Sequence, residues 1–350
     1  MKGETTMRST VCTALGRVEI LNVPKPGISH PRDAIVRVTA TSICGSDLHM
    51  IDHPEMVGSP IGHEFVGVVE ETGDGVGGLP LGTRVVGPAA VWCGSCAECR
   101  RGNESFCSNG GIFGCGPEFG SLGGAQSEWI RVPFADLALA VIPDSVSDAQ
   151  ALAVGDALST GWSGVRRVIN GPTEVLLVLG CGPIGLSAVS TAKLHGVRHV
   201  VAVDLHETRR RLAVELGASA ALGSVEEAVV MVRELTGGRG ADGVVDAAGA
   251  PATIAAAFEA LGIGGRIAIL GLASKPIEVD FLSLLYKSTT VWAGLGDLTR
   301  MGTLLTAIES GVFEPGVMFT ETIELGQIVN AYSAIAAGGT DVVKYLVTVP

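Results

Sequence analysis

The segment Glu174-Val-Leu-Leu-Val-Leu-Gly-Cys-Gly-Pro-Ile-Gly185 joins a run of apolar residues to three glycines spaced G-x-G-x-x-G. The apolar residues 174–179 predict a buried strand, and residues 186–195 after the last glycine predict a helix. A strand, this glycine pattern and a helix, in that order, are typical of a dinucleotide-binding unit. The segment therefore predicts a doubly wound parallel sheet of the Rossmann type around it.

Each glycine of this loop has a separate physical reason. Gly180 permits the tight turn, Gly182 lets the backbone approach a pyrophosphate, and Gly185 lets the helix pack closely on the strand. Pro183 and Ile184 lie between the last two glycines, where the helix N-terminus offers free N–H groups and partial positive charge to phosphates. We expect these five residues to bind the pyrophosphate of the cofactor.

Asp204 follows the next predicted strand, residues 199–203, and comes 19 residues after Gly185. A carboxylate at this distance accepts hydrogen bonds from the adenosine ribose. It would also repel a 2′-phosphate, which favours NAD over NADP. The arginines at 209–211 weaken that preference, because one of them could pair with such a phosphate. The alternative role of Asp204 is to cap the helix that begins near Glu207.

Strands and helices continue to alternate beyond Asp204, which supports a doubly wound parallel sheet. We expect helices at residues 208–216, 225–235 and 252–261, and strands at residues 243–246, 266–270 and 290–292.

A run of four cysteines, spaced C-x2-C-x2-C-x7-C, occupies residues 93–107. Four thiolates can complete a tetrahedral shell around one zinc ion, and such a closed site is structural rather than catalytic. A disulfide pair is one alternative, but residues 1–17 lack the apolar core of an export signal, and a reducing compartment favours metal. An iron–sulfur cluster is the other, although ferredoxin-type runs close with a three-residue gap and a proline. We expect the zinc ligands to be Cys93, Cys96, Cys99 and Cys107.

The composition excludes some partners. The chain has 350 residues, of which 47% are hydrophobic and 17% charged, which suggests two domains of ordinary size. Its net charge of −12 argues against nucleic acid and anionic membranes as partners. The longest apolar stretch, residues 175–189, is interrupted by glycines and a proline. It is also too short for a helix that spans a membrane, which needs about 20 apolar residues. We expect a soluble, cytoplasmic protein that acts on a small molecule.

Three further segments carry reactive side chains: Cys44-Gly-Ser-Asp-Leu-His49, Gly62-His-Glu-Phe-Val-Gly67 and Gly155-Asp-Ala-Leu-Ser-Thr-Gly161. Alone they are weak signals, because an isolated cysteine usually belongs to the core. Together with the four-cysteine lobe and the glycine loop, they resemble the zinc-containing medium-chain alcohol dehydrogenases. The resemblance extends from the strand at Met7 to the last strand near Lys344.

The resemblance implies a GroES-like β-barrel catalytic domain joined to a Rossmann coenzyme domain, with the active site between them. The catalytic domain would cover residues 1–155, the coenzyme domain residues 156–293, and residues 294–350 would return to the catalytic domain. Such relatives hold two zinc ions per chain, one catalytic and one structural, and are dimers or tetramers joined through the edges of their coenzyme-domain sheets. The apolar residues 263–272 and 289–295 are candidates for that edge, and the alternative is that they are ordinary buried strands of one subunit.

By motif, Cys44, His63 and Asp156 match the ligands of the catalytic zinc. Asp156 departs from the more common cysteine, but a carboxylate oxygen is a normal zinc ligand. Glu64 matches a glutamate close to the metal. Ser46 and His49 match the two residues of a proton relay. Thr160 matches a residue packed on the nicotinamide, and Arg209 matches a basic residue beside the ribose. Lys344 matches, in a looser alignment, a residue that contacts the pyrophosphate. Asp47 is left out of the catalytic set.

The activity implied is reversible hydride transfer between an alcohol and NAD, with zinc as the Lewis acid. Ala89 and Ala90, with Trp92 and Trp292 as walls, suggest a roomy pocket for secondary, bulky or polyol substrates. Asp156 keeps a formaldehyde-type dehydrogenase open, and a dedicated carbonyl reductase would use the same groups. The zinc-free branch of the fold and a non-catalytic nucleotide-binding protein are further alternatives, which bound-metal analysis distinguishes.

Overall fold

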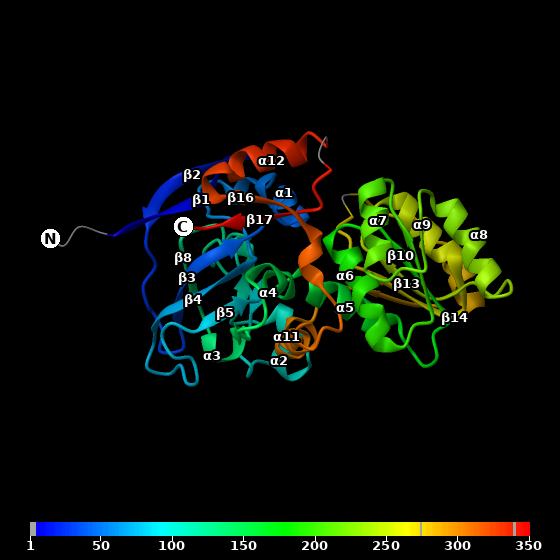
Figure 1. The fold of residues 1–350 in the computed structure, drawn as a ribbon, viewed down its shortest axis with the longest axis horizontal. Coiled ribbons are helices and arrows are strands. Elements are labelled where there is room, and N and C mark those ends of the chain that lie inside the picture. Colours follow the sequence, from blue (N-terminus) through cyan, green and yellow to red (C-terminus); the bar gives the residue numbers. More distant parts are fainter. Residues whose placement is uncertain (1–4, 274, 339–340) are drawn as a thin grey trace. The chain divides into compact units, whose positions relative to one another are not determined.

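The computed structural model describes residues 5–273, 275–338 and 341–350, so the first four residues of the stretch inspected for an export signal lie outside it. The chain forms two units (Figure 1). Unit 1 contains Met1–Asp156, Asp297–Val312 and Phe319–Pro350, and unit 2 contains Ala157–Gly296 and Phe313–Met318.

These boundaries differ from the predicted ones at two places. Asp156 belongs to unit 1, because α4 (Asp148–Val154) still packs against the strands of that unit. The segments 294–296 and 313–318 belong to unit 2, although the sequence placed them in the catalytic domain. For the second segment the reason is a short 3-10 helix, Pro315–Met318, that contacts α6 (Pro183–Ala192).

Unit 2 is built on a parallel sheet, which confirms the predicted doubly wound α/β architecture. Because β10 lies between β11 and β13, the strand order reverses beside it, and ligands bind at such switch points. In spatial order the strands are β12 (Ala220–Leu222), β11 (His199–Val203), β10 (Val175–Leu179), β13 (Ala241–Asp246), β14 (Leu261–Ile269) and β15 (Thr290–Ala293).

The central strand β10 is buried along its whole length, as the continuous apolar run predicts for a parallel sheet covered on both faces. Val175, Leu177 and Leu179 pack with α8 (Val225–Leu235) and α9 (Pro251–Ala260). The helices α5 (Ala157–Val168) and α6 pack together and against the sheet (Figure 1). The remaining helices are α7 (Glu207–Glu215) and α10 (Phe281–Lys287).

Two strands of unit 2 depart from the prediction. The strand β12 is missing from it, because Ala220, Ala221 and Leu222 are too short a run to show alternation. The strand β14 begins at Leu261, five residues before the predicted start, although Gly262, Gly264 and Gly265 read as a turn. A register shift between Ala241 and Gly243 of β13 accommodates this glycine-rich start.

Unit 1 contains a mixed, largely antiparallel sheet and a separate hairpin. The order in the sheet is β16-β17-β3-β4-β5-β9, and β8 also pairs with β3. The sheet strands are β3 (Ala34–Thr41), β4 (Phe65–Thr72), β5 (Arg84–Gly87), β8 (Trp129–Val132), β9 (Ala140–Val141), β16 (Phe319–Glu324) and β17 (Lys344–Thr348). The hairpin is β1 (Thr6–Ala14) with β2 (Arg17–Pro24), and β6 (Ala90–Val91) pairs with β7 (Gly111–Ile112).

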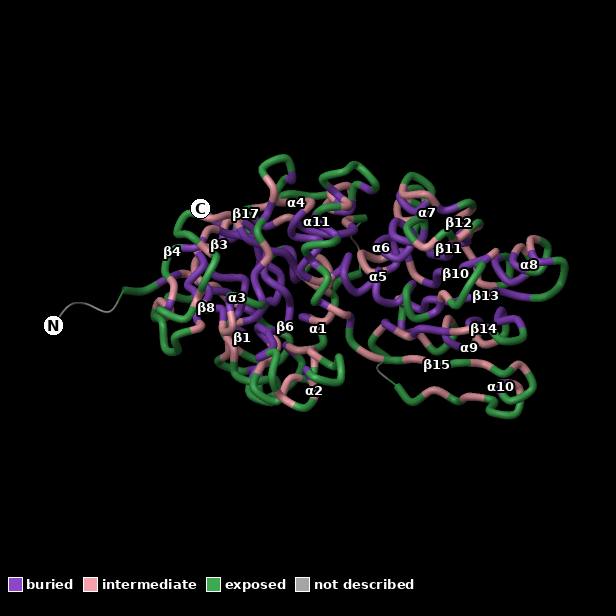
Figure 2. Tube along the Cα trace, turned by 90° about the horizontal axis from the view of Figure 1, so that it is seen from below, coloured by how far each residue is buried: buried purple, intermediate pink, exposed green. Residues whose placement is uncertain are grey.

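One core joins the beginning and the end of the chain in unit 1. Phe65 and Phe113 meet edge to face at its centre, with ring centroids 5.5 Å apart. Tyr332 of α12 and Tyr345 of β17 pack into the same core, which is coloured as buried in Figure 2. The helices of unit 1 are α1 (Gly45–Ile51), α2 (Ala97–Arg100), α3 (Ala135–Ala138), α4, α11 (Met301–Glu309) and α12 (Ile328–Ala336). Across the described residues, no helix has the length and apolar character needed to cross a bilayer.

Candidate metal centres and cofactor site

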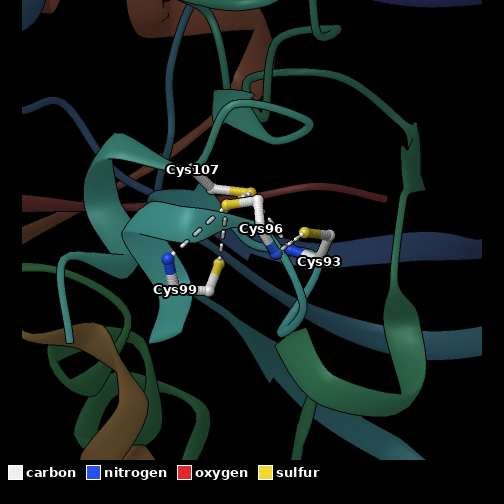
Figure 3. A group of neighbouring side chains, drawn as sticks. All are labelled: Cys93, Cys96, Cys99 and Cys107. Atoms are coloured by element: carbon white, nitrogen blue, oxygen red, sulfur yellow. Dashed lines mark hydrogen bonds between the residues drawn. The ribbon is translucent and has the colours of Figure 1, made fainter. Parts of the chain in front are cut away.

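The four cysteines of the lobe converge on one point (Figure 3). Cys96 is the N-cap of α2 and Cys99 lies within that helix. The sulfur of Cys96 lies 3.5 Å from that of Cys99 and 3.8 Å from that of Cys107. Four sulfurs at about 2.3 Å from a tetrahedral zinc ion would be about 3.8 Å apart. The lobe therefore fits a closed structural zinc site, and all four cysteines are free thiols rather than disulfides.

The pKa values of these thiols also favour a bound metal ion in the lobe. Burial raises the pKa of the Cys99 thiol to about 12. The pKa of Cys93 is lowered to about 5, because hydrogen bonds from Ser95, Asn109 and the Cys96 amide outweigh the opposing effect of burial. At neutral pH the lobe therefore holds thiolate and thiol side by side, and full ionisation requires a metal ion to neutralise the charge.

A second set of ligand atoms gathers in unit 1 from three loops. Cys44 precedes α1, His63 precedes β4, and Asp156 follows α4. Oδ2 of Asp156 lies 3.5 Å from the sulfur of Cys44 and 3.7 Å from Nε2 of His63. Sulfur, nitrogen and oxygen ligands of a tetrahedral zinc would be about 3.4–3.6 Å apart. These three side chains thus have the chemistry and the spacing of a zinc site with one open position.

The charges in this cluster depend on one another. Burial raises the pKa of the Cys44 thiol, and the Asp156 charge adds to that shift. Burial would lower the pKa of His63, but the charge of Asp47 and the close contacts with the Asp156 and Asp47 carboxylates raise it well above its ordinary value. Burial would raise the pKa of Asp156, yet contact with His63 lowers it. The raised pKa values of Cys44 and His63 favour their protonated forms, and a divalent cation would displace those protons.

Glu64 lies beside these ligands and is paired with Lys344 of β17. Nζ of Lys344 donates to Oε1 of Glu64 at 2.8 Å, and both side chains are 1% exposed. Within the described residues, Oε2 of Glu64 has no hydrogen-bond partner. Lys344 was expected to contact the pyrophosphate. The structure places it in unit 1 and on Glu64, so the pyrophosphate contact stays a prediction.

Lys344→Met is expected to destabilise the chain by about 3–5 kcal/mol, because it leaves the Glu64 carboxylate buried without its partner. Urea unfolding of the purified protein measures this loss. The double variant Lys344→Met/Glu64→Leu is the control, since replacing both members of a buried pair by apolar groups is often neutral. Equal stability of Lys344→Met and wild type would contradict the assigned role of the pair.

The predicted proton relay lies on α1. The hydroxyl of Ser46 is 3.4 Å from Nε2 of His63. His49 is exposed and stands in the last turn of the same short helix. Residues three apart on a helix are neighbours on its surface. The helix therefore places one hydroxyl at the ligand cluster and one imidazole in solvent, as a relay requires.

The sequence analysis left Asp47 out of the catalytic set, but the structure places it against the candidate ligand His63. It is 1% exposed, and its Oδ2 accepts from the backbone N–H of Cys44 at 2.9 Å. Its Oδ1 lies 3.2 Å from Nδ1 of His63, within ion-pair distance but short of ordinary hydrogen-bond geometry. A carboxylate behind a metal-binding histidine fixes its tautomer and ring orientation. The available signal was its position, three residues after Cys44 and at the start of a helix.

The glycine loop of unit 2 meets the geometric requirements of a dinucleotide site. Gly180 has a φ of +87°, in the left-handed region that favours glycine. Gly182 is the N-cap of α6, and Pro183 occupies the first turn. A Cβ on Gly185 would lie 1.8 Å from the carbonyl oxygen of Gly180, so only glycine permits this close packing.

Asp204 ties the end of β11 to this loop. Its Oδ2 accepts from the backbone N–H of Cys181 at 2.8 Å, and its Oδ1 accepts from that of His206 at 2.8 Å. The N-cap of α7 is His206, so Asp204 is not the cap residue of that helix. Arg209 lies 3.8 Å from the same carboxylate. Asp204 therefore stands at the carboxyl end of β11 beside the glycine loop, with Arg209 of α7 next to it.

Thr160 of α5 also belongs to unit 2 and is 8% exposed. A Cβ on Gly296 would lie 2.5 Å from its hydroxyl oxygen, so the two residues are in tight contact. The predicted cofactor residues therefore gather in unit 2, with the exception of Lys344, and the predicted metal ligands gather in unit 1.

Family models match both units. Residues 30–144 match the alcohol dehydrogenase GroES-like domain, and residues 183–307 match the zinc-binding dehydrogenase family. The first match confirms the predicted GroES-like fold in the N-terminal part of the chain.

Relatives match over nearly the whole chain. An alcohol dehydrogenase of Cupriavidus necator is 33% identical, over 97% of this chain and 97% of the relative. The solved alcohol dehydrogenase TADH from Thermus sp. ATN1 is 35% identical with a TM-score of 0.92, and the match covers 98% of this chain and 100% of that one.

Two solved relatives carry a nicotinamide cofactor. An Escherichia coli alcohol dehydrogenase in complex with NADH is 25% identical (TM-score 0.86, 98% and 99% coverage). A Sinorhizobium meliloti protein bound to NADP is 26% identical (TM-score 0.85, 99% and 100% coverage). With its fold, its two metal-ligand clusters and these matches, the chain belongs to the zinc-containing medium-chain dehydrogenase/reductase family, as an oxidoreductase of the alcohol dehydrogenase type.

Proposed function

We propose that this protein is a zinc-dependent alcohol dehydrogenase that transfers hydride reversibly between a secondary, bulky or polyol alcohol and NAD. The observation that carries the proposal is the set of thiol, imidazole and carboxylate donors of Cys44, His63 and Asp156 at tetrahedral spacing. A second, closed set of four cysteines accounts for the structural metal separately. An open three-ligand site beside a closed one is the arrangement that a zinc-dependent catalyst requires.

Zinc held by these ligands would polarise the alcohol oxygen, and NAD would accept the hydride. Two residues of the chain would carry the proton. The hydroxyl of Ser46 would accept the alcohol proton as it gives up its own, and the exposed imidazole of His49 would release a proton to solvent, with the ribose of the bound cofactor completing the path between them. The carbonyl product, NADH and one proton account for the atoms and electrons lost by the alcohol. The reverse reaction uses the same groups.

The pocket proposal rests on small residues in unit 1. Ala89, Ala90 and Trp92 pack in one cluster with Leu298. Two alanines in place of bulky side chains leave room for a branched or long alcohol, which favours secondary, bulky or polyol substrates over ethanol. The carboxylate ligand Asp156 favours a formaldehyde-type dehydrogenase as the second candidate.

The test is a screen of NADH formation by zinc-loaded protein with primary, secondary, aromatic and polyol alcohols and with formaldehyde. We expect activity on the secondary or polyol class that disappears on chelation and returns with zinc. Activity on formaldehyde alone would favour the second candidate. If a protein shown to hold two zinc ions forms no NADH with any alcohol, the next assay measures NADH oxidation with carbonyl compounds. No activity in that assay either would overturn the proposal.

NAD is the proposed cofactor because the Asp204 carboxylate is held in place by two backbone N–H groups. Asp204→Ala is expected to lower kcat/KM with NAD by roughly 10- to 100-fold, the effect of losing a hydrogen bond to a charged group. Activity with NADP should rise relative to NAD. The control is Glu207→Ala, which removes an exposed acid from the first turn of α7. An unchanged ratio of NAD to NADP activity in Asp204→Ala would contradict the ribose role.

We also propose that the protein is a homodimer or homotetramer joined through β15. This strand ends the sheet of unit 2, and an edge strand presents unpaired backbone groups to another chain. Figure 2 colours much of β15 and α10 as exposed. The exposed apolar residues around this edge include Ile263, Phe281, Leu285, Tyr286 and Val291. Light scattering during gel filtration tests the assembly, and a monomeric mass would contradict it.

A further inference from the structure

Gln126 is a fully buried amide at the centre of a hydrogen-bond network in unit 1. Its Nε2 is 3.1 Å from the carbonyl oxygen of Ser42 and 3.1 Å from Oδ2 of Asp47. Both partners can only accept, so they take the two N–H bonds of the amide and fix its orientation. The hydroxyl of Tyr332 lies 2.9 Å from Nε2 and 3.2 Å from Oε1 of Gln126, and with both N–H bonds taken it donates to Oε1. The amide thus uses its donors and its acceptor within the core.

The same residue also packs against the backbone that carries His63. Gly62 has a φ of +89°, and a Cβ there would lie 2.4 Å from Cγ of Gln126. The backbone N–H of Ala125 donates to the carbonyl of Gly62 at 2.8 Å, and that of Gln126 donates to the carbonyl of Ile61 at 3.2 Å. Gln126 therefore contacts the peptide segment immediately before the histidine ligand.

His63 is thus restrained from two sides. Its backbone follows the segment that pairs with residues 125–126, and its Nδ1 faces Asp47, whose other oxygen is held by Gln126. Tyr332 closes the network from α12, a helix 206 residues further along the chain. We propose that Gln126 and Tyr332 are positioning residues that orient Asp47 and thereby aim Nε2 of His63 at the catalytic metal.

The physical reason is that Oδ2 of Asp47 has two donors, the Gln126 amide and the Cys44 backbone N–H, and loses the first in Gln126→Leu. This carboxylate is 1% exposed, so no water replaces a lost hydrogen bond, and an unsatisfied buried charge is costly. The carboxylate would then turn toward its remaining donor, the Cys44 amide, and release the imidazole of His63. Partners behind a metal ligand commonly contribute 10- to 100-fold to metal affinity. The inference rests on the proposed function in one respect, namely that this cluster holds a metal ion.

The experiment compares Gln126→Leu and Tyr332→Phe with wild type in the full chain. The affinity of each zinc site is measured by competition with a chromophoric chelator. The four-cysteine lobe is an internal reference, because general destabilisation would affect both sites. We expect Gln126→Leu to weaken zinc binding at the Cys44, His63 and Asp156 cluster by roughly 10- to 100-fold. Tyr332→Phe should weaken zinc binding at the same cluster by roughly 2- to 10-fold, the value of a neutral hydrogen bond. The visible spectrum of cobalt bound at that site should also change.

Tyr345→Phe is the matched control, since it removes a hydroxyl from another buried tyrosine of the same core that is not a partner of Gln126 among the described residues. It should leave both affinities unchanged. Wild-type affinity and an unchanged cobalt spectrum in Gln126→Leu would overturn the inference, as would equal weakening of both sites. If Gln126→Leu does not fold, Tyr332→Phe decides by the same criteria. A wild-type chain that binds zinc only in the cysteine lobe would instead overturn the proposed function.

Discussion

His63→Ala is expected to reduce alcohol oxidation by roughly 10³-fold or more, while the variant still binds NAD. A catalytic metal is worth several kcal/mol of transition-state stabilisation, and each 1.36 kcal/mol is a factor of about ten in rate. His63 supplies one of the three ligand atoms, and the two that remain, from Cys44 and Asp156, make a weaker site. The predicted cofactor residues Gly180, Gly182, Gly185 and Asp204 lie in unit 2, outside the mutated unit.

The measurement combines steady-state rates, metal content and NAD binding followed by fluorescence. Metal content should fall from two zinc ions to one, and NAD binding should stay near the wild-type value. Cys44→Ser, which keeps the size of the side chain, should show the same pattern with a smaller cost in stability. The control is His53→Ala, which removes an exposed histidine just after α1. Turnover within a factor of ten of wild type in His63→Ala would show that the reaction does not use this cluster.

The fold could be predicted where the signal is local. The strand β10 was predicted within one residue, and β11 and α8 at their observed bounds, because the apolar runs of unit 2 are interrupted by glycines. The start of β14 could not be predicted, since the glycines at 262, 264 and 265 mimic a turn and pairing with β13 overrides that local preference. Strand pairing of this kind depends on residues distant in the sequence.

The residues of the candidate site also differ in whether a local sequence pattern reveals them. Cys44, His63 and Asp156 stand out as reactive residue types within short motifs, and the structure brings their ligand atoms together. Gln126 and Tyr332 could not be found from the sequence, because their role is a contact between residues 206 positions apart. Nor does any local pattern indicate that Lys344 pairs with Glu64, since this contact joins the last strand to the loop before β4.

Cys96→Ala is expected to cost about 3–5 kcal/mol of stability and to lower the midpoint of thermal unfolding by roughly 10 °C, because loss of a structural metal is among the largest single-residue effects. Cys96 has two roles that alanine cannot replace. Its sulfur lies within 3.8 Å of the sulfurs of both Cys99 and Cys107, and it caps α2 by accepting from the Cys99 amide. The lobe contains little apolar core of its own, and Phe106 within it is 60% exposed. Metal ligation must therefore provide most of its stability.

Calorimetry and metal analysis of the same sample test this prediction. The variant should hold one zinc ion, and its activity per folded molecule should fall much less than that of His63→Ala, since the catalytic ligands are unchanged. Cys12→Ala is the matched control, because it removes a fully buried thiol of unit 1 that lies outside both metal clusters. A Cys96→Ala protein with two zinc ions and an unchanged unfolding midpoint would show that the lobe does not depend on a metal. The expected result, in which Cys96→Ala loses stability but keeps its activity, would separate the two metal centres by function. The same measurements on His63→Ala should show the reverse, with activity lost and the zinc ion of the cysteine lobe kept.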